Sequence, residues 1–141
     1  MSLPMVRYTE PTTVTVNVAP VNDAPVVDLN GVSAGINTVL SYTENSAPQA
    51  LAPNLTVVDV DSPQLTGAVV TISNAKAEDV LAFTSASGIT GQYTFNATSG
   101  VGTLTLAGAA TVAQYQAALR TVTYANSSDA PDTTARAVSF Q

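Results

Sequence analysis

The chain has 141 residues and a mass of 14.3 kDa, with ten acidic and four basic side chains and no cysteine, histidine or tryptophan. Without thiolates or imidazoles it cannot build a cysteine nucleophile, a serine–histidine pair, or a zinc or haem site of ordinary ligation. The net charge of −6 leaves no basic surface for phosphates, so we expect no nucleic-acid partner.

Residues 1–25 combine an alternating strand with a stiff linker. Met1–Leu3 is typical of an expression-tag remnant. Thr13–Val18 alternates valine with threonine or asparagine, which is the pattern of a strand that buries one face. Pro20 and Pro25 fix φ and restrict the residues before them to extended geometry. We therefore predict a domain boundary at residues 20–25, and we interpret residues 1–25 as a tag remnant, the last strand of a preceding repeat and a linker.

Residues 26–141 contain a series of short segments with period-two alternation. Large apolar side chains fall on one face and small or polar ones on the other, as in antiparallel sheets with one buried side. The predicted strands are Val26–Leu29, Val39–Thr43, Leu55–Val60, Ala68–Ser73, Val80–Thr84, Gln92–Ala97, Thr103–Leu106, Arg120–Tyr124 and Arg136–Phe140. The predicted core contains Leu81, Phe83, Tyr93, Phe95, Leu104, Leu106, Val122, Val138 and Phe140. This pattern predicts an all-β antiparallel sandwich.

One segment has a helical pattern instead. Thr111 and Gln114 have the spacing of a capping box, in which each side chain satisfies the other residue's backbone N–H. Strong helix formers follow, and Tyr115 and Leu119 lie four residues apart on one face. We predict one short helix over Val112–Leu119, which closes an end or edge of the sandwich.

The linker closely resembles the boundary between cadherin-like repeats of large bacterial surface and secreted proteins. The segment Val14–Pro25 ends in Asn-Asp-Ala-Pro after an alternating strand, and Leu104–Gly108 with Ala113–Tyr124 resembles the second half of the same repeat. The resemblance covers nearly all of residues 14–141. It implies a cadherin-like or immunoglobulin-like Greek-key β-sandwich over residues 26–141. It also implies tandem repetition, an extracellular or cell-surface location, and calcium at the joints between repeats.

Four residues form the predicted calcium site at the amino-terminal joint. Asp59 and Asp61 alternate at the end of a predicted strand, so both carboxylates point to one side, and calcium favours six to eight oxygen ligands. The resemblance implies that Asn22 and Asp23 of the linker join them. The alternative is that Asp59 and Asp61 only end a strand before a turn, and that Asn22 and Asp23 belong to a solvated linker.

Three other acidic segments differ in what they predict. The resemblance implies that Glu44 serves a second calcium site at the opposite end of the module. Cadherins carry an acidic triplet late in the repeat, and this chain has Asn126–Asp132 roughly there instead, which weakens that site. Glu78 and Asp79 follow a lysine in a polar stretch and are interpreted as a solvated loop.

Two functions remain compatible with the sequence. The first is a non-catalytic structural and adhesion repeat whose joints are stiffened by calcium and whose partners are the neighbouring repeats of the same chain. The second is a module that binds a glycan or a protein through loops such as Ser85–Gly91 or Asn126–Asp132. No apolar run is long enough for a membrane span, so we expect no membrane insertion.

The end of the chain adds a prediction about assembly. In cadherin-like repeats a strand equivalent to Thr12–Val18 closes the module, and none follows Gln141 here. The sheet edge beside Arg136–Phe140 would then be unpaired, and an unpaired edge is a template for another strand. We therefore expect Thr12–Val18 to pair with a neighbouring molecule, giving strand exchange or a homodimer.

Overall fold

The structure, a computed structural model, describes residues 2–141. Met1, part of the predicted tag remnant, lies outside these residues. Strands and one short helix make up the described chain in this order: β1 (Val26–Asp28), β2 (Gln49–Ala50), β3 (Thr56–Val58), β4 (Gln64–Ile72), β5 (Asp79–Ala82), β6 (Thr90–Asn96), β7 (Val101–Thr111), α1 (Val112–Arg120), β8 (Thr123–Asn126) and β9 (Val138–Phe140).

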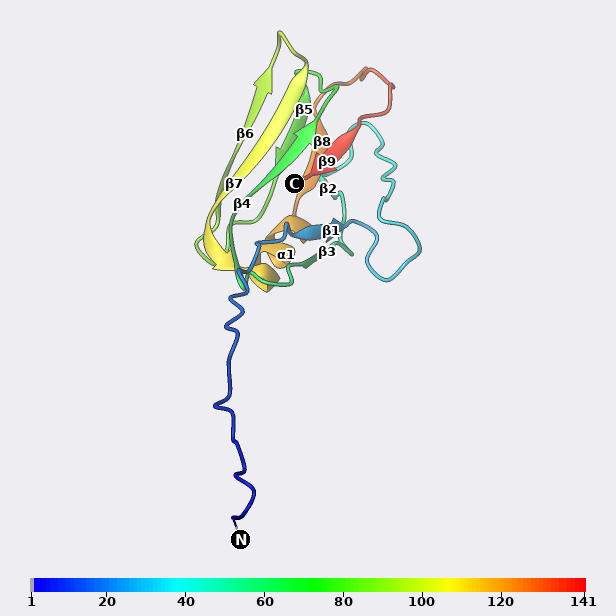
Figure 1. Ribbon diagram of the computed structural model, residues 1–141. Helices are drawn as coiled ribbons and strands as arrows, with labels where there is room; N and C mark the ends of the chain where they lie inside the picture. The colour runs from blue at the N-terminus through cyan, green and yellow to red at the C-terminus, as the bar shows by residue number, and fades with distance from the viewer. Residues whose placement is uncertain (1) are drawn as a thin grey trace.

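Two antiparallel sheets form the body of the molecule. The four-stranded sheet has the order β6-β7-β4-β9, and the three-stranded sheet has the order β2-β8-β5. A two-stranded ribbon of β1 and β3 lies beside α1, at the end of the sandwich where the linker enters (Figure 1). The predicted all-β antiparallel sandwich with one short helix is therefore confirmed, and its Greek-key connectivity stays a prediction.

The core fills the space between the two sheets. Leu81, Leu104, Leu106 and Val122 are buried, as predicted. The other predicted core residues are partly buried and pack against this cluster: Phe83, Tyr93, Phe95, Val138 and Phe140. Alternation along β7 explains the arrangement, because Leu104 and Leu106 point inward while Thr105 between them is exposed. Tyr115 of the helix is also fully buried and closes one end of the core.

The helix forms where its capping box predicts it. The Thr111 hydroxyl accepts from the Gln114 backbone N–H at 3.1 Å, and the Gln114 side-chain oxygen accepts from the Thr111 N–H at 2.8 Å. The helix ends at Arg120, so the prediction that a strand begins there is wrong, and β8 starts at Thr123. From the last turn of the helix, Arg120 Nε donates to the Leu55 carbonyl at 2.6 Å.

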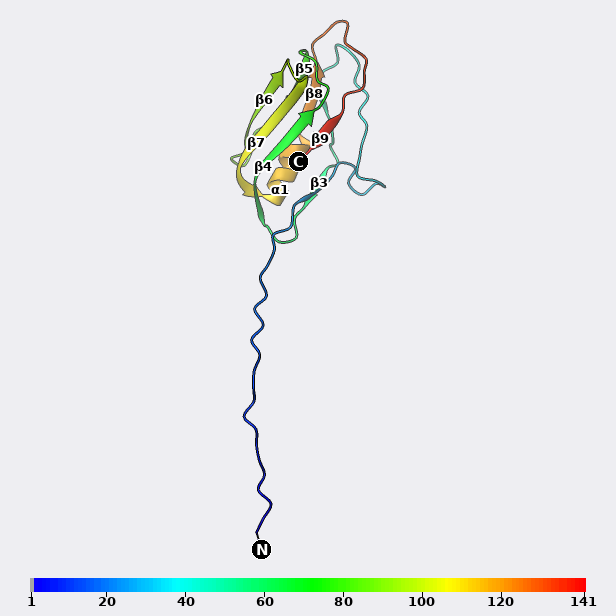
Figure 2. The same cartoon turned by 45° about the horizontal axis from the view of Figure 1, so that its top comes forward.

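Two predicted strands have no partner in the described chain. Residues 2–25 form no ladder, and the chain before the linker extends away from the sandwich in both views (Figures 1 and 2). Val39–Thr43 is also not a strand, although Leu40 and Tyr42 are half-buried while Val39 and Ser41 are exposed. Their side chains therefore keep the alternation of a strand without backbone pairing.

Candidate functional site

The linker is held against the turn between β3 and β4. The Asp23 backbone N–H donates to Asp61 Oδ2 at 2.8 Å. The Ser62 hydroxyl lies 3.0 Å from Asn22 Oδ1 and 3.4 Å from Asp61 Oδ1, within donating distance of both. The structure therefore brings three of the predicted joint residues together and adds Ser62, which the sequence analysis read only as a turn residue.

Asp59 organises the same turn. Its Oδ1 accepts from the backbone N–H of Ser62 at 2.8 Å and of Asp61 at 3.1 Å. The bond from Ser62 is the main reason why the pKa of Asp59 lies below its ordinary value, and the Asp61 bond adds to it. The carboxylate is therefore ionised and fixed in place at neutral pH, and it positions Asp61 to face the linker.

The donor chemistry at this joint fits a hard cation in kind. Carboxylate, amide and hydroxyl oxygens of Asp59, Asp61, Asn22 and Ser62 are the ligand types that calcium takes. Within residues 2–141, however, no three acidic side chains are grouped closely enough to hold a metal ion. A cation at the joint would therefore draw on amide, hydroxyl and backbone oxygens as well as carboxylates.

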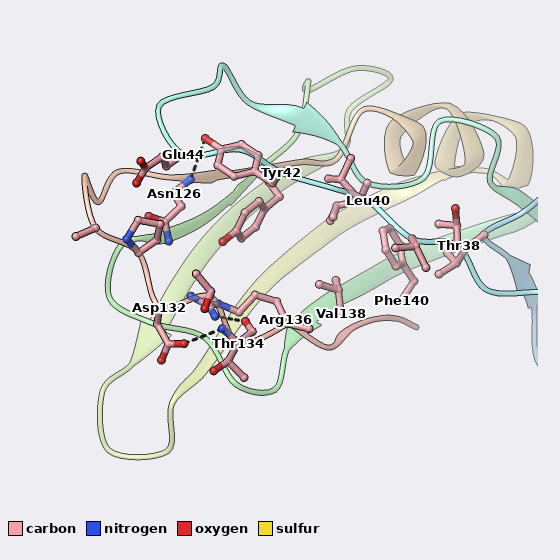
Figure 3. Close-up of a pocket in the computed structure, with 18 residues that line it drawn as sticks. Thr38, Leu40, Tyr42, Glu44, Asn126, Asp132, Thr134, Arg136, Val138 and Phe140 are labelled. Carbon is pink, nitrogen blue, oxygen red and sulfur yellow. Dashed lines mark hydrogen bonds between the residues drawn. The ribbon is translucent and has the colours of Figure 1, made fainter.

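Glu44 lies away from this joint. It is exposed and lines a groove together with Tyr42 and Asn126, at the far end of β8 from the helix (Figure 3). The structure does not bring it to the residues of the amino-terminal joint, in keeping with its predicted place at the opposite end. Whether it binds calcium stays a prediction.

The groove has a volume of about 820 Å³ and separates residues 38–44 from β9 and the segment before it. One half of its lining is apolar, with Leu29, Leu40, Leu51, Val138 and Phe140. The other half is polar, with Glu44, Asn126, Asp132, Thr134 and Arg136. Figure 3 shows Leu40 and Tyr42 on one wall and Val138 and Phe140 on the other.

Asp79 is the buried anion beneath the polar half of this groove. The prediction that it lies in a solvated loop is wrong, because it is 0% exposed. Its Oδ1 accepts from the Tyr124 hydroxyl at 2.6 Å and from Asn126 Nδ2 at 2.7 Å. Its Oδ2 accepts from Arg136 Nε at 2.6 Å and from the Lys76 backbone N–H at 2.8 Å. Four donors therefore surround one carboxylate.

These contacts decide the protonation of the cluster. Burial by itself would raise the pKa of Asp79, but the hydrogen bonds from Arg136 and Tyr124, helped by the other two donors, hold it below its ordinary value. Burial and the bond to Asp79 raise the pKa of Tyr124 to about 12. The cluster is thus a charged Asp79–Arg136 pair with a neutral tyrosine at neutral pH.

The same pair fixes one wall of the groove. Arg136 precedes β9, and its bond to Asp79 ties that segment to β5 of the opposite sheet. On the surface, Lys76 Nζ lies 3.1 Å from an Asp132 carboxylate oxygen. Tyr42 and Tyr124 meet edge to face at 5.0 Å between ring centroids on the other wall. The groove is therefore held open by packed and paired side chains.

Comparison of the chain with protein-family models, curated proteins and solved structures finds no match. The cadherin-like resemblance thus rests on the motifs of residues 14–141 alone and stays a prediction. The single helix in residues 2–141 is too short to cross a membrane.

Proposed function

We propose that this domain is a non-catalytic structural and adhesion repeat of an extracellular or cell-surface protein, with a calcium-stiffened joint to the segment before it. The observation that carries the proposal is the docked linker, in which Asp61 and Ser62 hold Asn22 and Asp23. A linker held in one direction transmits the orientation of one repeat to the next. Neighbouring repeats of the same chain are the partners that this role requires.

Calcium acts at this joint through charge. Asp59 and Asp61 are acidic residues of one turn, and repulsion between their carboxylates opposes the geometry that holds the linker. A cation held by the carboxylates of Asp59 and Asp61 and the amide oxygen of Asn22 would remove that repulsion. Glu44 is the corresponding candidate at the other end.

Calorimetric titration of the full chain with calcium tests the proposal. Extracellular calcium modules have dissociation constants of about 0.1 to 1 mM. Calcium at ten times that value adds about 1.4 kcal/mol to the free energy of unfolding, a rise of a few degrees in melting temperature. We also expect slower proteolysis of the linker at residues 20–25.

Two variants sharpen the experiment. Asp59→Asn combined with Asp61→Asn should abolish the heat and the melting shift, and Glu10→Gln, an exposed acid in the tail, should keep both. Magnesium at the same concentration controls for ionic strength. No heat and no shift in the unaltered chain at about 10 mM calcium would show that these acids are only turn residues.

The groove favours a second candidate, a glycan- or protein-binding module. Its polar half combines the Tyr42 ring with Asn126, Asp132 and Arg136, and residues 126–132 border it. A glycan array probed with the full chain distinguishes this role. Binding that Asp132→Asn weakens, and that calcium chelation leaves unchanged, would favour the groove over the joint.

A further inference from the structure

Strand β9 is an open edge of the four-stranded sheet. It pairs with β4 on one side, with Thr71 opposite Ser139. The bonds of Val69 with Gln141 and of Ser73 with Ala137 continue the same ladder at alternate residues. The backbone N–H and C=O groups of Val138 and Phe140 therefore face away from β4, toward the groove edge, without a ladder partner in residues 2–141.

The opposite wall of the groove is a strand-like segment that also has no ladder partner. Leu40 and Tyr42 are half-buried and point into the groove, whereas Val39, which borders the groove as well, is 92% exposed. Their alternation matches that of Val138 and Phe140, which face the groove, and Ser139, which is exposed. Two extended segments with inward apolar side chains thus flank one groove (Figure 3).

The tail of the same chain supplies a matching strand. Val14, Val16 and Val18 are 89%, 76% and 85% exposed. They alternate with Thr13, Thr15 and Asn17, so one face of the extended segment is entirely valine. The segment has no charged side chain, and it therefore brings no charge into the apolar half of the groove.

We propose that this groove is an acceptor site for an extended strand and that its occupant is Thr13–Val18 of a second copy of this chain. The strand adds to the free edge of β9 and turns its valines toward Leu40, Val138 and Phe140. Its threonines and asparagine lie on the outer face with Ser139. Val14 to Val18 spans about 13 Å at about 3.3 Å per residue.

The tail of each molecule leads away from the groove of that same molecule. Asp61 and Ser62 hold Asp23 and Asn22, so the linker leaves from the β3–β4 turn. Beyond it the chain runs straight away from the sandwich (Figures 1 and 2). A return to its own groove would require the chain to reverse within a linker in which Pro20 and Pro25 fix φ and restrict the residues before them to extended geometry. Exchange between two copies needs no such reversal, and each copy then donates one strand and accepts one.

Sedimentation equilibrium of the full chain tests the exchange, with calcium chelated so that the result is independent of the proposed joint. We expect a concentration-dependent dimer of twice the 14.3 kDa monomer. Val16→Asp should raise its dissociation constant by about tenfold or more, because a charge would enter an apolar groove. The substitution lies in the tail, outside the sandwich, and so leaves the fold intact. Val6→Asp, at another exposed tail valine, is the matched control and should leave dimerisation unchanged.

Hydrogen exchange locates the acceptor. The amides of Val138 and Phe140 should become protected as the dimer forms, and Val16→Asp should remove that protection. A monomer at all concentrations overturns the proposal, as does a dimer that Val16→Asp leaves intact or that Val6→Asp weakens equally. A Val16-dependent dimer without protection at these two amides would overturn the assignment of the groove.

Discussion

The burial of the Asp79 carboxylate leads to a specific prediction about the stability of the domain. Asp79→Asn keeps the shape of the side chain and removes its charge. The carboxylate now accepts four hydrogen bonds, two on each oxygen. An amide offers one oxygen and one NH₂ group, so in either orientation the NH₂ faces two donors. Rotation of Asn126 offers no relief, because its Oδ1 already accepts from the Ser128 N–H at 2.9 Å.

The size of the loss follows from the burial of the pair. The Arg136 side chain is 9% exposed and that of Asp79 is 0% exposed, so the substitution leaves a buried guanidinium without its counter-charge. Breaking such a pair costs about 3 to 5 kcal/mol. Domains of this size have a total free energy of unfolding of about 5 to 15 kcal/mol. We therefore expect Asp79→Asn to remove about a fifth or more of the stability.

Urea unfolding followed by far-UV circular dichroism measures this loss. Glu78→Gln is the matched control, an exposed neighbour, and should change the free energy of unfolding by about 0.5 kcal/mol or less. Asp79→Asn with Arg136→Met should cost less than the sum of the two single changes, because the double variant leaves no unpaired charge. A loss for Asp79→Asn no larger than that of Glu78→Gln would refute the role of this pair.

Four further predictions concern two titrations, an unpaired hydroxyl and the helix cap. The pKa of Asp79 is lower in the folded state than in the unfolded state. The stabilisation that the ionised carboxylate gives the fold is therefore complete above about pH 4 and is lost as the pH falls further. Asp79→Asn should flatten the dependence of the free energy of unfolding on pH in this acidic range. At alkaline pH, the pKa of Tyr124 is raised to about 12 in the folded state, so stability should fall as the pH rises from about 10 toward 12; Tyr124→Phe should reduce that fall, to which the raised pKa values of Tyr93 and Tyr115 also contribute. The Tyr93 hydroxyl is buried without a hydrogen bond, so Tyr93→Phe should be neutral or raise the free energy of unfolding by about 1 to 3 kcal/mol; a destabilised variant would reveal a missed partner. Thr111→Ala should cost about 1 kcal/mol in urea unfolding, whereas Thr111→Ser, which keeps the bond to Gln114, should cost much less.

Local patterns in the sequence predicted most of the fold. Strict alternation placed Leu104 and Leu106 in the core, and the capping box placed the start of the helix. Both signals lie within a few residues and need no knowledge of the tertiary fold. The segment Val39–Thr43 failed because a strand also needs a backbone partner, which alternation alone does not supply.

At the candidate sites, too, some features were predicted from sequence motifs and others were not. Asp61 and the linker residues meet as the family motif implied, although the contact spans 38 residues of sequence between Asp23 and Asp61. The burial of Asp79 was not predicted, because its polar neighbours in sequence indicated a solvated loop. It has the same parity as Leu81 in β5 and therefore shares the inward face, a signal that the sequence did contain. Its partner Arg136 lies 57 residues away and has no local signature.

The Asp79–Arg136 pair also bears on the order in which the domain folds. Asp79 enters the interior with β5, whereas its counter-charge arrives with residues 136–141, as β9 pairs Phe140 with Val70 of β4. Contacts this far apart in sequence form late, because the loop between them must close first. Until they form, an ionised Asp79 must stay hydrated, so water remains in this part of the interior. Docking of residues 136–141 is then the step that expels the water, and we expect it to coincide with the final, cooperative closure of the core.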